Sequence, residues 1–198
     1  FYDLTGQSLW YDEGVSLEFS EGDSAGAVLE RLGTTRTSER YQPLYFVLLY
    51  SWRQLFGSSE WALRSLSALL GSVALIAFVP VSRGFLFGRQ RLAAIGFMAL
   101  SSFAVYYSQE VRPYSLLLLI CVGHWLLFVK LGDQDGTGWK RALLVPTAAV
   151  SLLGGLTSLF FSFHVASTGG AWLLTHDKRS RELSFWVVSI LALVPSFA

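Results

Sequence analysis

The chain of 198 residues is 53% hydrophobic and only 15% charged, with a formal net charge of +1. Soluble domains carry about 25% charged residues, so this composition favours a membrane protein. No basic stripe follows the sequence, which argues against a nucleic-acid partner, and a single cysteine, Cys121, excludes a disulfide within the chain.

The two ends of the sequence indicate a fragment. The chain opens in a polar segment without an initiator Met, shows no signal peptide, and stops within an apolar run. We therefore expect it to be part of a longer protein, truncated at both ends.

The first segment, residues 1–41, is polar and holds eight of the fourteen Asp and Glu residues. Near its start the adjacent carboxylates Asp12 and Glu13 lie between aromatic residues. Apolar residues at helical spacing predict a short helix over 24–32. The acidic pair is either a functional site or a solvated turn, and the flanking aromatics favour the first interpretation.

The next segment, 42–57, predicts a helix that starts at Pro43, where a missing N–H costs nothing, and stops at Gly57. Its apolar run, 44–56, is shorter than the roughly 20 residues that a spanning helix needs. We therefore expect a juxtamembrane helix that lies in the membrane interface.

The rest of the chain consists of apolar runs separated by basic clusters. The clusters are 83–91, 130–141 and 178–181. For 142–174, two antiparallel helices and a single tilted pair with a different break both remain open. The sequence thus predicts an all-α polytopic bundle with these transmembrane helices: 61–81, 92–107, 114–129, 142–157 and 159–174, with 183–198 beginning another.

The positive-inside rule orients this bundle. If the three basic clusters are cytoplasmic, five spans place residues 1–60 and the turn 108–113 outside. This parity holds only if 44–56 does not span. The acidic pair and the second polar cluster, Tyr106–Tyr114, are then expected on the same face of the membrane.

These two polar groups suggest a reaction between a lipid-linked anion and a polar acceptor. Asp12 is a candidate general base, and Arg112 a candidate ligand for a phosphate through bidentate hydrogen bonds. The alternative for Glu110 and Arg112 is a helix-terminal ion pair beside interfacial tyrosines. Two adjacent carboxylates are too few ligands to predict a divalent metal, so the cofactor stays unknown.

Other motifs carry less chemistry. His124 and His164 lie within apolar runs and are expected to pack in the bundle, while His176 belongs to a basic loop; their spacing does not fit a metal site. The sequence has no Gly-rich phosphate loop, nucleophile elbow or internal repeat. The pairs 154–155 and 169–170 are glycines and predict close helix packing.

Five motifs in a fixed order carry a resemblance to a known family. They are Ser8–Gly14 (SLWYDEG), Gln42–Tyr45 (QPLY), Phe56–Arg64 (FGSSEWALR), Phe87–Arg89 (FGR) and Tyr106–Tyr114 (YYSQEVRPY). Together they resemble polytopic glycosyltransferases of the GT-C superfamily, of the family 39 type that includes protein mannosyltransferases and lipid A aminoarabinose transferases. The resemblance extends over about residues 5–130 and more weakly beyond.

The resemblance implies a function and a set of residues. Such enzymes transfer a sugar from a polyprenyl-phosphate donor to an acceptor outside the cytoplasm, with inversion, in a prokaryotic plasma membrane. Asp12, with Glu13 beside it, matches the catalytic acidic residue of the family, and Arg112 matches a basic position after the Tyr-Ser-Gln motif. Gln42-Pro43 departs from the commoner double-proline motif. Further candidate substrate-binding residues are Tyr11, Gln42, Arg64, Tyr107, Gln109, Glu110 and Tyr114.

Other functions remain open from the sequence. A non-enzymatic transporter or lipid-handling protein is the main alternative, and it would favour inverted repeats with broken helices, which the sequence does not show. A membrane hydrolase or ligase acting on the same carrier would differ only in its acceptor.

Overall fold

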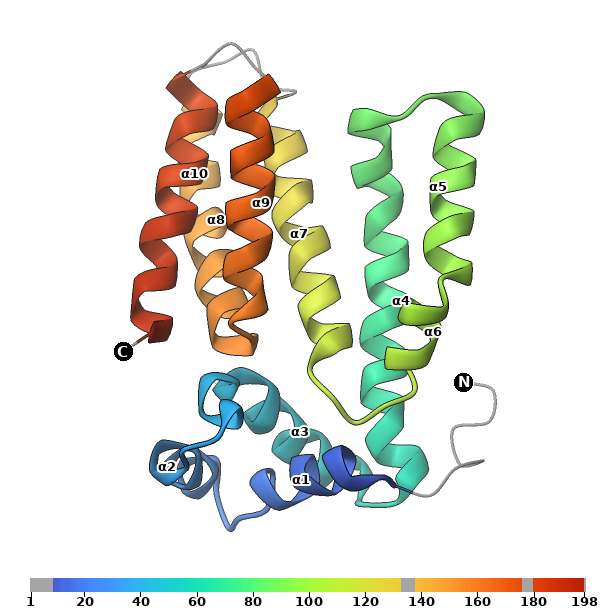
Figure 1. The fold of residues 1–198 in the computed structure, drawn as a ribbon, viewed down its shortest axis with the longest axis vertical. Coiled ribbons are helices and arrows are strands. Elements are labelled where there is room, and N and C mark those ends of the chain that lie inside the picture. The colour runs from blue at the N-terminus through green and yellow to red at the C-terminus, as the bar shows by residue number, and fades with distance from the viewer. Residues whose placement is uncertain (1–8, 133–137, 176–179, 198) are drawn as a thin grey trace.

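The computed structural model describes residues 9–132, 138–175 and 180–197, and all regular elements within these ranges are helical. Ten α-helices and two short 3-10 helices account for them (Figure 1). The predicted all-α class is confirmed.

Three helices precede the bundle and lie across one of its ends (Figure 1). They are α1 (Tyr11–Phe19), α2 (Ala25–Thr34) and α3 (Pro43–Phe56), with the 3-10 helix η1 (Ser38–Tyr41) before α3. The Ser24 hydroxyl caps α2 by accepting a bond from Ala27 N at 3.2 Å, and Pro43 opens α3. The predicted helices 24–32 and 42–57 correspond to α2 and α3, whereas α1 was not predicted.

Helix α4 (Glu60–Phe85) is long and apolar enough to cross a membrane by length and composition. Its start is fixed by Ser59, whose hydroxyl accepts a bond from Ala62 N at 3.3 Å. Among the described residues it is the one helix that meets both criteria. Shorter apolar helices cover these ranges: Tyr114–Lys130, Ala142–Thr157 and Leu183–Ser196.

The predicted helix 92–107 is divided into two. Helix α5 (Gly88–Leu100) ends at Ser101, where φ is −59° and ψ is 120°, and α6 (Ser102–Tyr107) follows directly. The apolar run continues through this position, so hydropathy alone does not reveal the change in ψ that separates the helices. None of the residues of α5 is buried, and this helix packs on the outside of α4.

Four more helices complete the bundle: α7 (Tyr114–Gly132), α8 (Gly138–Thr157), α9 (Phe160–Thr175) and α10 (Ser180–Leu193), followed by the 3-10 helix η2 (Val194–Phe197). The chain turns between α8 and α9 at Ser158, so the interpretation as two antiparallel helices fits the structure. A Cβ at Gly154 would overlap the Phe161 ring, and one at Gly155 would overlap Ser196, as expected for close packing.

The two ends of the bundle differ in the charges near them. The carboxyl ends of α4, α7 and α9 lie at one end with the amino ends of α5, α8 and α10 (Figure 1). The predicted basic clusters border these helix ends, although Lys178, Arg179 and His176 are outside the described residues. The N-terminal helices and the turn 108–113 lie at the opposite end.

A single hydrophobic cluster joins the N-terminal helices to the bundle. Val28 of α2 and Phe46 of α3 belong to the same buried cluster as Leu63 of α4, Leu116 of α7 and Phe161 of α9. Since burying apolar area contributes about 25 cal/mol per Å², this shared core holds the N-terminal helices against the bundle.

Candidate functional site

The first turn of α1 presents Glu13 to two other elements. Its carboxylate is fully buried and accepts bonds from Arg64 Nε at 3.0 Å and Arg64 Nη2 at 2.8 Å. It also accepts bonds from the backbone N–H of Val111 at 3.0 Å and of Trp10 at 3.4 Å. The Glu13 carboxylate therefore ties α1 to α4 and to the turn before α7, and its acceptor positions are occupied.

The preceding carboxylate has a different environment. Successive residues of an α-helix point about 100° apart, so Asp12 faces away from Arg64. Its side chain is 40% exposed, and one carboxylate oxygen lies 3.9 Å from Arg112 Nη2. The backbone oxygen of Asp12 accepts a bond from Arg112 Nη1 at 3.4 Å. Asp12 thus keeps an accessible carboxylate next to a cation.

The turn 108–113 supplies that cation. The Arg112 N–H bonds to Glu110 O at 2.9 Å, and Pro113 at the end of the turn lets α7 begin at Tyr114. The Arg112 side chain is largely buried, and its guanidinium carbon lies 5.8 Å from the centre of the Tyr114 ring. The Tyr107 ring packs on Tyr114 at 4.3 Å. Aromatic rings therefore fix the guanidinium that faces Asp12.

Several buried polar atoms around this site have no hydrogen-bond partner. Tyr45 of α3 and Ser67 of α4 are both fully buried, and their hydroxyls lie beside each other without forming a hydrogen bond of good geometry. Burial raises the pKa of the Tyr45 hydroxyl well above its usual range, so it stays neutral. The unpartnered atoms linked to this site are Tyr45 Oη, Ser67 Oγ, Glu110 Oε2 and Arg112 Nε, and Gln42 Oε1 at the start of α3 is also buried without a partner.

Glu110 is the third carboxyl group of the site. The residue is only 6% exposed. Burial raises the pKa of Glu110 above its ordinary value, and the neighbouring carboxylates of Glu13 and Asp12 raise it further. A bond from the Tyr106 hydroxyl and the charge of Arg112 act in the opposite direction without cancelling the effect.

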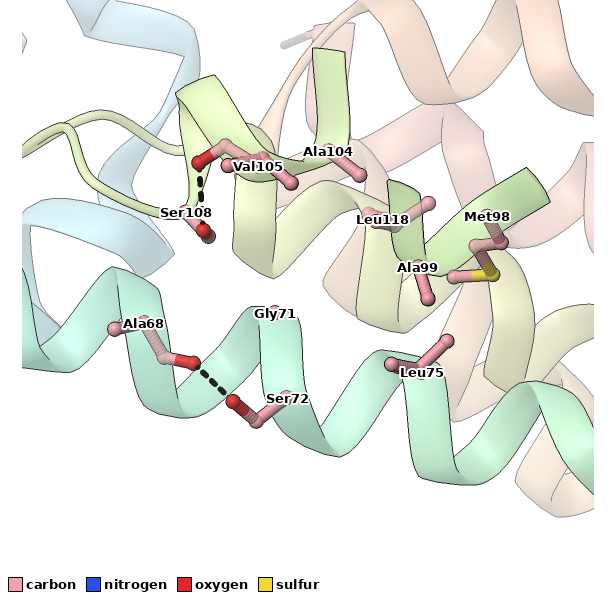
Figure 2. A pocket seen from close by; sticks show the side chains of 10 residues that line it. All are labelled: Ala68, Gly71, Ser72, Leu75, Met98, Ala99, Ala104, Val105, Ser108 and Leu118. Atoms are coloured by element: carbon pink, nitrogen blue, oxygen red, sulfur yellow. Dashed lines mark hydrogen bonds between the residues drawn. The ribbon is translucent and has the colours of Figure 1, made fainter. Parts of the chain in front are cut away.

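Two neighbouring cavities share part of their lining, and the smaller one reaches the turn. One, of about 170 Å³, lies between α4 and α6 and reaches Ser108 (Figure 2). The other, of about 610 Å³, is apolar and lies between α4 and α5, with Phe78, Phe97 and Phe103 in its wall. The lining residues common to both are Met98, Ala104 and Leu118. The apolar cavity beside α5 thus adjoins a smaller one that reaches the turn that carries Arg112.

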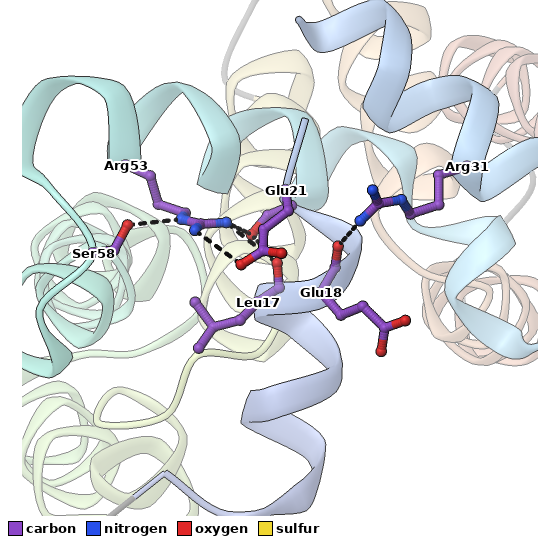
Figure 3. Close-up of polar contacts among 7 residues, drawn as sticks. Leu17, Glu18, Glu21, Arg31, Arg53 and Ser58 are labelled. Atoms are coloured by element: carbon purple, nitrogen blue, oxygen red, sulfur yellow. Dashed lines mark hydrogen bonds and ion pairs between the residues drawn. The ribbon is translucent and has the colours of Figure 1, made fainter. Parts of the chain in front are cut away.

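Arg53 of α3 holds the other end of α1 in place (Figure 3). Its Nη1 donates to Leu17 O at 3.2 Å and to Ser20 Oγ at 3.0 Å. Its Nη2 pairs with the Glu21 carboxylate at 3.4 Å, and its Nε donates to Ser58 Oγ at 3.2 Å. Since Asp12 and Glu13 lie on α1, these contacts help to position both carboxylates.

The structure brings most of the predicted site residues together. Asp12, Glu13, Arg64, Glu110 and Arg112 form one connected group. Tyr107 and Tyr114 pack at its edge, and Gln109 is half-buried in the same turn.

The environments of two predicted residues and of two further ones complete the description. Tyr11 is 82% exposed and contributes no buried contact. Arg64 pairs with the buried Glu13 carboxylate. Tyr45 and Ser67 are not predicted as site residues. Each lies in a largely apolar helix, and no local sequence signal distinguishes it from residues that only pack in the core.

The histidines form a separate cluster inside the bundle. His124 of α7 bonds to Ser189 of α10 at 2.9 Å, and His164 of α9 lies 3.4 Å from the other ring nitrogen of His124. Within the described ranges, no group of three or more His, Cys, Asp or Glu side chains could hold a metal ion. The pair therefore joins three helices through polar contacts.

Comparison with protein-family models, with curated proteins and with solved structures finds no match to this chain. The interpretation of the site therefore depends on the chemistry of its own residues.

Proposed function

We propose that the chain is the core of a membrane glycosyltransferase that moves a sugar from a polyprenyl-phosphate donor to an extracytoplasmic acceptor. The observation that carries the proposal is the position of the accessible Asp12 carboxylate, 3.9 Å from the guanidinium of Arg112. A base and an anion-binding cation at this separation fit a reaction in which an acceptor hydroxyl attacks a sugar phosphate.

The bond changes follow from these two roles. Asp12 accepts the proton of the acceptor hydroxyl as its oxygen attacks the anomeric carbon from the face opposite the phosphate. The bond between that carbon and the phosphate oxygen breaks, so the anomeric configuration inverts and polyprenyl phosphate leaves. The guanidinium of Arg112 offsets the negative charge that develops on the leaving phosphate.

Glu13 and Arg64 support this chemistry as positioning residues. The carboxylate of Glu13 is saturated by Arg64 and by the Val111 N–H, so it has no free lone pair for a second proton transfer. Its four bonds fix α1 relative to the turn that carries Arg112. We therefore assign the catalytic role to Asp12 alone.

The apolar cavity favours a lipid carrier. Its wall of aromatic and aliphatic side chains suits an isoprenoid chain, and the adjoining smaller cavity extends to Ser108 in the polar turn. A lipid bound along this path would present its phosphate near Arg112.

A multi-pass membrane arrangement completes the proposal. Shorter apolar helices accompany α4, and the basic clusters of the sequence border the end of the bundle away from Asp12. By the positive-inside rule, that end faces the cytoplasm and Asp12 faces outside. A cysteine introduced at Glu18, an exposed position of α1, is then expected to react with an impermeant reagent in intact cells.

The test is sugar transfer by the full-length protein with Asp12→Asn. Because general-base catalysis contributes about a hundred- to ten-thousand-fold, kcat is expected to fall by that factor while the donor KM changes little. Glu18→Gln, an exposed carboxylate of the same helix, is the matched control and retains activity. Transfer by Asp12→Asn at the rate of the control would remove Asp12 as the base.

A lipid-handling protein is the second candidate, because the apolar cavity suits a lipid whether or not a sugar is transferred. Such a protein would bind polyprenyl phosphate and show no transfer in the wild type with any lipid-linked sugar. The same assay, combined with a measurement of carrier binding, separates the two functions.

A further inference from the structure

Glu110 has a buried carboxyl group that the proposed mechanism does not use. The residue is 6% exposed, and Oε2 is buried without a hydrogen-bond partner. An unpaired buried polar atom costs about 1–3 kcal/mol, so a partner supplied by a ligand is the simplest explanation for its retention.

The charged and titratable groups that face Glu110 come from four elements. They are Asp12 and Glu13 of α1, Arg64 of α4, the Tyr106 hydroxyl of α6, and Arg112 in its own turn. Arg64 is committed to Glu13 by two bonds, and Arg112 lies at ion-pair distance from Asp12. Three carboxyl groups therefore share two guanidinium groups, and Glu110 is the one without an ion pair among the described residues.

This balance of charge and burial favours the neutral form of Glu110. An ionised Glu110 would lie near two other carboxylates in a water-poor environment, which is unfavourable on both counts. The raised pKa of Glu110 agrees with this reading. This environment differs from that of Asp12, whose side chain is 40% exposed and lies at ion-pair distance from Arg112.

A second unpartnered atom lies two residues away. Arg112 is 8% exposed and its Nε is buried without a hydrogen-bond partner. A guanidinium N–H and a carboxylic O–H are both donors, and the oxygens of a phosphodiester are acceptors only. The two unpaired groups therefore match one class of ligand atom.

We propose that Glu110 is a neutral carboxylic acid that donates its O–H to an oxygen of the donor phosphate, next to the bond from Arg112. The identity of that phosphate rests on the proposed function. When Glu110 ionises, its carboxylate repels the phosphate, so binding of the donor requires the protonated form. No bond is made or broken in this step, and the proton stays on Glu110.

The probe for this role is a polyprenyl methyl phosphate. As a phosphodiester it keeps one negative charge across the pH range, and it carries no sugar to transfer. Its Kd for the full-length protein in detergent is measured over a pH series. For the wild type, Kd is expected to rise about tenfold per pH unit above the pKa of Glu110.

Three variants test whether the pH dependence of Kd comes from Glu110. Glu110→Gln keeps a donor that cannot ionise, so its Kd is expected to match the wild type at acidic pH and to stay constant as pH rises. Glu110→Ala lacks the donor and is expected to bind about tenfold or more weakly at every pH. Glu30→Gln, an exposed carboxylate on α2, is the control and retains the wild-type slope.

A second measurement covers the case in which Glu110→Gln fails to fold. The infrared carbonyl band of a protonated carboxyl group in the wild type is expected to persist above the pH at which exposed carboxyls ionise, and to shift when the probe binds. A pH slope shared by wild type and Glu110→Gln, or the absence of this band, would overturn the proposal.

The two proposals fail separately. If the probe binds with the expected pH dependence but no variant or wild type transfers a sugar, the transferase function fails and the phosphate contact stands. If transfer depends on Asp12 but the Kd of the probe does not change with the ionisation of Glu110, the transferase function stands and the proposed contact of Glu110 with the phosphate fails.

Discussion

The Glu13 carboxylate and the Arg64 guanidinium form a bidentate pair that joins residues 51 positions apart, with bonds of 3.0 and 2.8 Å. The Glu13 side chain is fully buried, and that of Arg64 is 6% exposed. A buried pair of this kind contributes little net stability relative to apolar packing, but loss of one partner leaves an uncompensated charge. Its value in this fold is therefore to specify how α1 meets α4.

Removal of either partner is expected to destabilise the protein. Glu13→Gln or Arg64→Met alone should lower the free energy of unfolding by about 3–5 kcal/mol, because each leaves a buried charge unpaired. The double variant should lose less than the sum of the two. Chemical unfolding in detergent measures all three, with Glu18→Gln as the exposed control. Additive losses would show that the two side chains are not coupled.

Arg112 is expected to control donor binding. Arg112→Ala should raise the donor KM by about ten- to a hundred-fold, since bonds to charged groups contribute about 1.5–3 kcal/mol. Arg112→Lys keeps the charge but loses the planar fork, so it should fall between wild type and Arg112→Ala. Steady-state transfer kinetics provide the measurement. If KM for the donor is the same in all three, the phosphate is bound elsewhere.

The sequence predicts most helices because their signals are local. Serine caps at 24 and 59, Pro43 at the start of α3, and long apolar runs mark helix ends and interiors without reference to the rest of the chain. Helix α1 is not predicted from these signals because its few apolar residues do not recur at helical spacing. The break between α5 and α6 at Ser101 is not predicted either, because the apolar run continues through this position and hydropathy does not depend on backbone angles.

The candidate site is predictable in its members but not in their roles. The motifs identify Asp12, Glu13 and Arg112 as candidates, but no local sequence signal shows which of the two adjacent carboxylates is buried. That assignment depends on the rotation of α1 and on Arg64, far away in sequence. The same limit explains why Tyr45 and Ser67, which meet only in the folded chain, were missed.

Arg53 is expected to stabilise the placement of α1. Arg53→Ala removes bonds to Leu17 O and Ser20 Oγ, and it should cost about 1–2 kcal/mol and speed amide exchange across α1. The Glu21 side chain is 58% exposed, so Glu21→Ala should cost less than about 0.5 kcal/mol. Unfolding and hydrogen exchange measure both. An equal effect of the two variants would assign the stability to the ion pair instead.

Glycines of the bundle should respond to substitution according to the space around them. Gly154→Ala would overlap the Phe161 ring and is expected to cost about 1–3 kcal/mol. Gly170→Ala is the matched control, because a Cβ there meets nothing within 4 Å. That variant should be neutral or stabilising by up to about 1 kcal/mol, since alanine favours helix. Thermal unfolding distinguishes them, and similar losses at both sites would contradict close packing of α8 and α9.

The ionisation of Glu110 should leave a signature in stability even without a ligand. Because burial raises its pKa, the folded protein holds this proton to a higher pH than the unfolded chain, whose carboxyl titrates at its ordinary value of about 4.5. The stabilising contribution of the proton is therefore complete below that value. It is lost as pH rises through the raised pKa of the folded state.

Glu110→Gln abolishes this dependence, so the comparison of the two proteins isolates it. The free energy of unfolding of the wild type, relative to Glu110→Gln, is expected to decrease with rising pH across that interval and then to become constant. Chemical unfolding at a series of pH values supplies the measurement, with Glu30→Gln as a control that follows the wild type. If the free energy of unfolding of the wild type, relative to Glu110→Gln, instead increased with pH, the folded state would favour the charged carboxylate. The attraction of Arg112 would then exceed the cost of burying that charge.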